Sequence, residues 1–150
     1  MEYQIATIYD CEALTELRMR MRRELDADFN SDLIYAQTLD FFKRNIENGT
    51  HIAFTCEHDR QMIATAGITL FEIMPTTEHP NGKVARLMNM YVEPRYRSKG
   101  IAKELLNRVM TYAGEHQIGK VVLNPSQMGK SLYKNYGFQL LPDEYVFYLH

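Results

Sequence analysis

The sequence predicts an α/β protein whose central mixed sheet carries helices on both faces. Strand-like runs alternate with amphipathic helical stretches along the whole chain, and residues 52–92 form a succession of strands without an intervening helix. A helical stretch then joins the strands at 84–92 and 120–123, so this pair should run parallel. The 150 residues show no repeat or linker, which indicates a single domain over 1–150.

The chain is expected to open with a short alternating strand at 3–7. Apolar residues spaced by three and four then predict a helix over 11–25, with Asp10 as its N-cap. The same helix carries a basic cluster that we interpret as a solvated face: Arg18, Arg20, Arg22 and Arg23.

A second helix should begin at Ser31 or Asp32 and stop at Gly49. Beyond it, two strand-like runs at 52–57 and 62–71 flank a short polar turn, which is typical of a hairpin.

The second half of the chain predicts a strand, a crossover helix, a strand and a short helix, at 84–92, 101–117, 120–123 and 128–136. Two final strands are expected at 138–141 and 146–149, joined by a turn at Pro142.

Composition excludes several classes of protein. A net charge of −2 gives no reason to expect nucleic acid or an anionic membrane as a partner. No apolar run approaches the roughly 20 residues that span a bilayer, and no secretory signal is recognised, so we expect a cytoplasmic protein. Cys11 and Cys56 lack metal-ligand spacing and the five histidines are scattered, so no metal is expected.

The segment after residue 92 is the most informative part of the chain. A strand ends there, and a basic, glycine-containing turn opens directly onto a helix. Backbone N–H groups and the helix dipole at such a place bind phosphate. Gly100 and Ala102 are small enough for a diphosphate to approach, while Arg97, Lys99 and Lys103 add positive charge. The alternative is a turn with a purely structural role.

Two further motifs lie near the C-terminal end of the chain. Gly129-Lys-Ser131 has the context of a P-loop lysine, but Asn124 stands where that motif requires glycine, which disfavours an ATP- or GTP-binding protein. Tyr133 in the last short helix could have a structural role, with its ring in the core.

Taken together, two motifs carry a family resemblance. The pattern R-x-x-G-x-A at 97–102 resembles the acetyl-CoA diphosphate signature of the GNAT N-acetyltransferase superfamily. The pattern L-Y-x-x-x-G-F at 132–138 resembles that family's second signature. The predicted order of elements also resembles the GNAT fold over nearly the full chain, so residues 1–150 would be one acetyltransferase domain.

The resemblance implies acetyl-CoA as co-substrate and assigns its contacts. The diphosphate would be held by backbone N–H groups of the turn, made of Arg97, Ser98, Lys99, Gly100, Ile101, Ala102 and Lys103. The pantetheine arm would pair with the backbone of Met90, Tyr91 and Val92, beside a bulge that splays the sheet. Ser126 would contact the cofactor, although many members place asparagine there.

By the same resemblance, Tyr133 is the catalytic residue that protonates the departing thiolate of CoA. In many members a glutamate on the strand before the diphosphate turn acts as the general base, but the strand 84–92 contains no carboxylate. The general base stays open among Glu72, Glu93, Glu144 and a water relay.

The acceptor side would be bordered by the 72–83 loop and the helices within 11–48. These segments offer acidic and aromatic groups that suit a cationic amine, namely Glu78, His79, Tyr35, Phe41 and Phe42.

The function predicted from these arguments is N-acetyl transfer from acetyl-CoA to a primary amine of a small molecule or peptide, by direct attack in a ternary complex. The alternative is a non-catalytic acyl-CoA sensor that regulates a partner. The acceptor and the oligomeric state stay open, a homodimer included.

Overall fold

The computed structural model describes residues 1–149 and contains one five-stranded mixed sheet. In spatial order its strands are β1 (Glu2–Ile5), β2 (His51–His58), β3 (Gln61–Glu72), β4 (Lys83–Val92) and β5 (Lys120–Val122). The first four pair antiparallel, whereas β4 and β5 are parallel. The predicted mixed sheet and its parallel pair are therefore confirmed.

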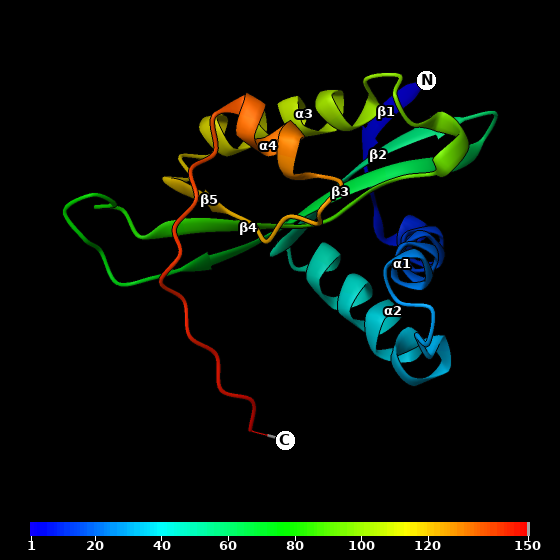
Figure 1. Cartoon of the computed structure of the whole chain (residues 1–150), viewed down its shortest axis with the longest axis horizontal. Coiled ribbons are helices and arrows are strands. Elements are labelled where there is room, and N and C mark those ends of the chain that lie inside the picture. Colours follow the sequence, from blue (N-terminus) through cyan, green and yellow to red (C-terminus); the bar gives the residue numbers. More distant parts are fainter. Residues whose placement is uncertain (150) are drawn as a thin grey trace.

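Helices cover both faces of this sheet (Figure 1). One face carries α1 (Cys11–Leu25) and α2 (Ser31–Glu47), and the other carries α3 (Ile101–Glu115) and α4 (Lys130–Tyr136). Short 3-10 turns, η1 (Ile8–Asp10) and η2 (Pro94–Tyr96), precede α1 and α3.

The larger part of the core lies between the sheet and α3. Leu105, Leu106 and Val109 are fully buried there against β2, β3 and β4. A smaller cluster under α1 and α2 centres on Leu14 and Phe42. The apolar stripe of α3 thus fixes the helix that begins directly after the glycine-containing turn.

Two irregularities in the sheet matter for the site. Thr65 of β3 pairs with Tyr91, but Gly67 pairs with Met88, so β4 contains one extra residue and forms a bulge. Asn89 lies at this bulge with a φ of 59°. In addition, β5 pairs with β4 only at three positions, from Val84 to Arg86.

The prediction of two C-terminal strands was wrong. Residues 138–149 form no regular secondary structure, and beyond Phe138 the chain extends away from the body of the molecule (Figure 1). A strand needs a neighbour for its backbone hydrogen bonds, and this segment has no ladder partner within the described chain.

Two predictions about α1 also need correction. The Asp10 carboxylate makes no cap bond to α1; it accepts the Thr7 backbone N–H at 2.7 Å and closes η1 instead. The arginines of α1 are not simply solvated, because Arg18 donates to Asn89 and Arg20 pairs with Glu93. Among residues 1–149, no helix combines the length and apolarity needed to cross a bilayer.

We expect Leu105→Ala to lower the free energy of unfolding by about 3 kcal/mol, because it leaves a cavity in the fully buried face of α3. Urea unfolding followed by circular dichroism measures this change. The matched control is Asn107→Ala, at an exposed position of the same helix, which should change stability by less than about 0.5 kcal/mol. Equal effects of the two substitutions would contradict this account of the core.

Candidate functional site

The sheet opens between β4 and β5. Pairing with β5 stops at Arg86, so residues 87–92 of β4 have no neighbour on that side among the described strands. The Arg86 guanidinium donates to the Asn124 side chain at 2.9 Å and ties down the chain just after β5. The unpaired half of β4 contains the three residues predicted to receive the pantetheine arm: Met90, Tyr91 and Val92.

The side chains of these three residues are engaged on the two faces of the sheet. Met90 and Val92 belong to the core on the α3 side. Tyr91 is buried, and its hydroxyl donates to Glu24 of α1 at 2.8 Å. What this half-strand offers a ligand is therefore its backbone.

The unpaired half of β4 leads through η2 into the turn at the start of α3. Ser98 and Gly100 both have positive φ angles, 62° and 82°. The first helical bond runs from Glu104 N–H to the Gly100 carbonyl, and Gly100 supplies no side-chain cap. The N–H groups of residues 101–103 therefore have no partner within the helix and can donate hydrogen bonds to an anion. A Cβ atom at Gly100 would meet nothing within 4 Å, so the space above it is open.

Arg97 does not add free positive charge to this turn, which corrects the expectation from sequence. Its Nε donates to the Val92 carbonyl at 2.8 Å, and its Nη2 pairs with Glu24 at 2.7 Å. The guanidinium also lies 5.5 Å from the Tyr91 ring centroid. Arg97 thus holds the turn in place, whereas Lys99 and Lys103 are exposed and supply its charge.

Ile101 and Ala102 begin α3 in different surroundings. The Ile101 side chain is buried in the core and anchors the helix, whereas Ala102 is only partly buried. Neither position therefore places a large exposed side chain at the start of the helix.

Glu24 links α1 to the turn, and sequence reasoning missed it. Its two carboxylate oxygens accept from Tyr91 and Arg97, respectively 67 and 73 residues further along the chain. Burial alone would raise the pKa of this carboxyl, but the hydrogen bonds from Arg97 and Tyr91 outweigh it and hold the pKa below its usual value. Burial and the bond to Glu24 raise the pKa of Tyr91 to about 12.

Tyr133 lies on α4, and its ring is buried in the core on the α3 side. Its ring meets Phe138 edge-on, with centroids 5.7 Å apart. Burial raises the pKa of the Tyr133 phenol to about 12, so the group stays protonated at neutral pH. The ring therefore has a structural role, and the protonated phenol can still donate a hydrogen bond.

Ser126 has a local partner. Its hydroxyl accepts the Gly129 backbone N–H at 3.2 Å, in the turn that leads into α4. A Cβ atom at Gly129 would lie 3.2 Å from the Tyr133 ring, so this small residue lets the turn pack closely on the tyrosine.

A match to a family model shows the family of the whole chain. The model of the acetyltransferase (GNAT) family matches residues 11–138, which include the bulged strand, the turn and α4. The chain belongs to the GNAT family.

Two solved structures resemble the chain over almost its whole length. A predicted acetyltransferase from Clostridium acetobutylicum, solved with acetyl-CoA, is 31% identical, with a TM-score of 0.93 over 99% of this chain and 96% of that one. A GCN5-related N-acetyltransferase from Ralstonia eutropha JMP134 is 25% identical, with a TM-score of 0.89 and 99% of each chain covered.

Two curated rat proteins also match. The chain is 28% identical to N-acetyltransferase 8B over 75% of its own length and 50% of that protein. It is 34% identical to N-acetylaspartate synthetase over 49% of its length and 26% of that protein. The chain thus spans half or less of the curated relatives that it matches.

None of the three candidate glutamates in this GNAT chain lies free beside the bulge. Glu93 is paired with Arg20 and Arg95. Glu72 pairs with Lys83 at the opposite end of the β3–β4 ladder, and Glu144 lies in the extended C-terminal segment.

The groups at the bulge are instead Asn89, Arg18 and His51, which sequence reasoning did not select for the site. Asn89 is buried and accepts from Arg18 at 3.4 Å. The imidazole ring of His51 packs against Gly67. A Cβ atom added at Gly67 would lie 2.7 Å from that ring. Burial, with a smaller contribution from Arg18, lowers the pKa of His51 to about 4, so the ring is neutral at pH 7.

The acceptor-side aromatic residues are mostly packed. Phe41 and Phe42 both contact the His51 ring, with centroids 5.3 and 5.5 Å away. His79 is buried, and a Cβ atom at Gly119 would meet its ring. The Tyr35 hydroxyl donates to Glu16. Of the groups predicted to bind an amine, only Glu78 is an exposed side chain that makes no hydrogen bond or ion pair among the described residues.

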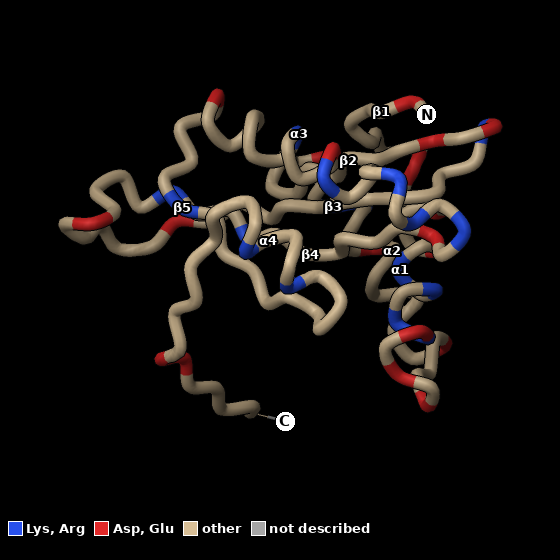
Figure 2. The backbone as a smooth tube through the Cα atoms, turned by 45° about the horizontal axis from the view of Figure 1, so that its top comes forward, with Lys and Arg blue, Asp and Glu red and all other residues tan. Residues whose placement is uncertain are grey.

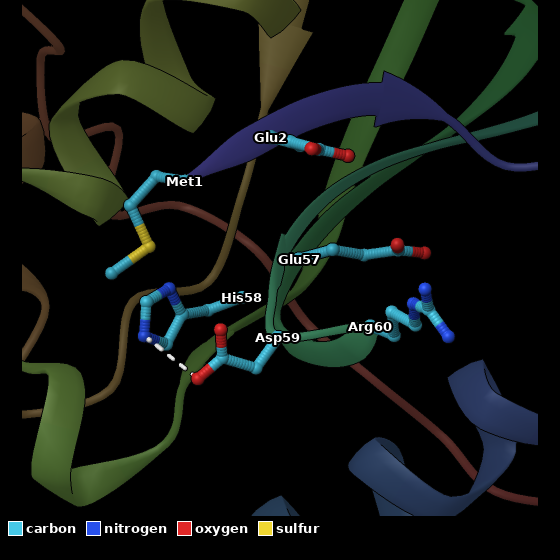
Figure 3. A pocket seen from close by; sticks show the side chains of 6 residues that line it. All are labelled: Met1, Glu2, Glu57, His58, Asp59 and Arg60. Carbon is cyan, nitrogen blue, oxygen red and sulfur yellow. Dashed lines mark ion pairs between the residues drawn. The ribbon is translucent and has the colours of Figure 1, made fainter.

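A hollow of about 350 Å³ lies at the β2–β3 turn (Figure 3). It is lined by Met1, Glu2, Glu57, His58, Asp59 and Arg60. His58 pairs with Asp59 at 3.4 Å. The lining has three carboxylates and one arginine, which makes this hollow unsuited to a diphosphate, so it is not part of the site described above.

We expect Glu24→Gln to lower the free energy of unfolding by about 1 kcal/mol at pH 7, since it weakens two hydrogen bonds at a partly exposed carboxylate. Because the folded-state pKa of Glu24 is lowered, this contribution exists above the unfolded pKa and is lost as the pH falls through the folded one. Urea unfolding at pH 7 and near pH 3 should show the difference from wild type disappearing in acid. The exposed Glu47→Gln is the control, and a difference that persists at low pH would contradict the assignment.

Proposed function

We propose that this chain is an acetyl-CoA-dependent N-acetyltransferase that acts on a primary amine of a small molecule or peptide. The observation that carries the proposal is the opening of the sheet. An unpaired half-strand of β4 contains the bulge and leads through η2 into a turn whose free N–H groups start α3. A long ligand with an amide-containing arm and an anionic end fits such a path.

In this proposal the pantetheine arm adds to β4 along residues 87–92, through backbone hydrogen bonds of the kind that join strands. The diphosphate binds the N–H groups at 101–103, and Lys99 and Lys103 contribute charge. Arg97 holds the turn in its shape and does not contact the diphosphate, because its guanidinium is already paired with Glu24. The Ser126 hydroxyl accepts the Gly129 N–H and keeps its own O–H, which would donate to the cofactor.

The acetyl thioester would then lie near the bulge at Asn89, where a backbone N–H can polarise its carbonyl. The amine attacks that carbonyl, a tetrahedral intermediate forms, and its collapse breaks the carbon–sulfur bond. Tyr133 donates a hydrogen bond to the departing thiolate. A phenol with a pKa of about 12 is a weaker acid than a thiol with a pKa near 8.5. Its main effect is therefore to stabilise the thiolate, and it gives up its proton only if its pKa falls in the complex.

The attacking amine must also lose a proton. His51 near the bulge has a pKa of about 4 and is too weak a base to take it at neutral pH. We therefore propose that the proton leaves through water along the open side of β4. The reaction should then speed up as rising pH deprotonates the amine itself.

The test is sustained release of CoA thiol when the protein meets acetyl-CoA and a library of amines. The curated relatives are named as an N-acetyltransferase and as an N-acetylaspartate synthetase, so the library should include amino acids as well as peptide N-termini. Tight binding of acetyl-CoA without turnover across such a library would favour the sensor alternative.

We expect Gly100→Leu to reduce acetyl-CoA affinity at least 100-fold, because the side chain would fill the open space above the turn. Isothermal titration calorimetry measures the loss. Gly49→Leu is a matched control, since Gly49 has a nearly identical φ of 80° and open surroundings at the end of α2. Any effect of backbone strain should appear in both variants. Wild-type affinity in the Gly100 variant would refute the position of the diphosphate.

We expect Tyr133→Phe to lower kcat roughly 100-fold while the Kd for acetyl-CoA stays within about twofold, because only the hydroxyl is lost. Thiol release gives kcat and calorimetry gives Kd. Tyr136→Phe, on the exposed side of the same helix, should leave both unchanged. Unaltered turnover in the Tyr133 variant would remove the residue from catalysis.

A further inference from the structure

One arginine of α1 carries a charge that the described chain does not neutralise. Arg18 is partly buried, and its Nη1 donates to the neutral side chain of Asn89 at 3.4 Å. Among residues 1–149, no carboxylate pairs with it. The guanidinium nitrogens that make no hydrogen bond within the described chain are not fully enclosed either. A ligand can therefore reach them.

The other arginines of this helix are placed differently. Arg20 forms an ion pair, Arg22 lies 5.6 Å from the centroid of the Phe29 ring, and Arg23 is exposed to solvent. Figure 2 shows these basic stretches on α1. Among the four arginines of the described helix, Arg18 alone combines partial burial with the absence of both a carboxylate and an aromatic ring.

An unpaired charge of this kind is costly for the free protein. Burial and a second positive charge on Arg22 both lower the pKa of Arg18, although a guanidinium stays protonated at neutral pH. The neighbouring His51 is neutral at pH 7 and offers no negative charge. A partly desolvated cation gains more from an added counter-charge than a solvated one does. The surroundings of Arg18 therefore favour an anionic ligand.

The face of the sheet beside the bulge is open on this side. Ala53, Gly67 and Met88 pair across three strands and so share a face, and Ala53 packs under α1 and α2. Met88 nevertheless has an exposed fraction of 45%, so the two helices do not cover this end of the face. On the same face His51 is 4% exposed, and its Nε2 has no partner among the described residues. Space and an unused polar atom thus accompany the unpaired charge.

We propose that Arg18 binds a carboxylate of the acceptor, and that the acceptor is an amine with a carboxylate close to its nitrogen, as in an amino acid. This inference rests on the proposed function, which places the acetyl thioester at the bulge. Because Arg18 bonds to Asn89 at that bulge, the carboxylate and the attacking nitrogen must lie close together. An amine with only positive charge would be repelled by Arg18.

The chemistry at Arg18 suits a carboxylate better than a phosphate group. A guanidinium forms two parallel hydrogen bonds with a carboxylate, and the single positive charge is matched by a single negative one. The turn before α3 differs, because it offers several backbone N–H groups together with Lys99 and Lys103. The two anionic groups of the proposed ternary complex are thereby assigned to different places.

The first test measures binding and does not depend on turnover. N-acetyl α- and β-amino acids, the expected products, are compared with their uncharged amides by calorimetry on protein saturated with CoA. We expect the best acid to bind at least about 30-fold more tightly than its amide. Arg18→Gln should abolish this preference. Arg23→Gln, at an exposed position of the same helix, should retain it. A wild type that prefers no acid over its amide would overturn the proposal.

The second test separates this inference from the proposed function. Thiol release is measured with free amino acids and with their amides, each as the ratio of variant to wild type. We expect Arg18→Gln to raise KM for amino acids about 30-fold and to change kcat/KM for amides by less than about threefold. Equal losses for both would overturn the inference while leaving acetyl transfer intact. Acid-selective binding without any thiol release would support the carboxylate site and contradict acetyl transfer.

A purely structural role of Arg18 predicts another pattern. If Arg18 only supported the bulge through Asn89, its loss would weaken the binding of acetyl-CoA. We expect the Kd for acetyl-CoA to stay within about twofold in Arg18→Gln, and Arg18→Lys to recover part of the preference for acids, because lysine keeps the charge without the planar fork. Circular dichroism checks that both variants are folded. A Kd raised tenfold or more would assign Arg18 to the support of the bulge and overturn the proposal.

Discussion

The bulge in β4 is the constraint on which the rest of the site depends. The extra residue at Asn89 changes the twist of the strand, and from there to Val92 the strand runs without β5 at its side. Packing beneath the sheet holds this geometry. Gly67 leaves room for the His51 ring, while Asn89 is buried and bonded to Arg18. A strand edge that the protein itself does not pair is then available to a ligand.

Packing on both faces of the sheet fixes the position of the unpaired half of β4 relative to the turn before α3. On one face, Ile101 and Leu105 anchor α3 in the core, so the turn cannot move independently of the sheet. On the other face, Glu24 holds both Tyr91 and Arg97. The backbone N–H groups at the start of α3 are therefore preorganised, which lowers the cost of binding an anionic ligand.

Much of the fold could be predicted from sequence, because periodicity and turn residues report local structure. The strands of the antiparallel meander, the crossover helix and the parallel pair all follow from such patterns. The prediction of two C-terminal strands failed for a physical reason. The pattern at 146–149 does report strand propensity, but a strand also requires a neighbour, and pattern says nothing about where that neighbour lies.

The candidate site likewise has residues that the sequence could predict and residues that it could not. The turn around Gly100 and the tyrosine at 133 stand out because their motifs are contiguous in sequence. The pairing of Arg97 with Glu24 could not be predicted, since the two residues are 73 positions apart and an arginine beside a phosphate turn suggests a ligand contact. The same holds for His51 and Arg18, whose meeting near Asn89 depends on how α1 and α2 pack on the sheet.

The carboxylate of Glu24 also sets a boundary for exchanging the segment that connects α1 and α2. It lies in the last turn of α1, two residues before the C-cap at Asp26, and one residue there supports the strand and the turn together. A transplanted α1–α2 connection should therefore be joined after residue 26. A junction placed earlier would remove the bonds by which α1 holds β4 and the turn before α3.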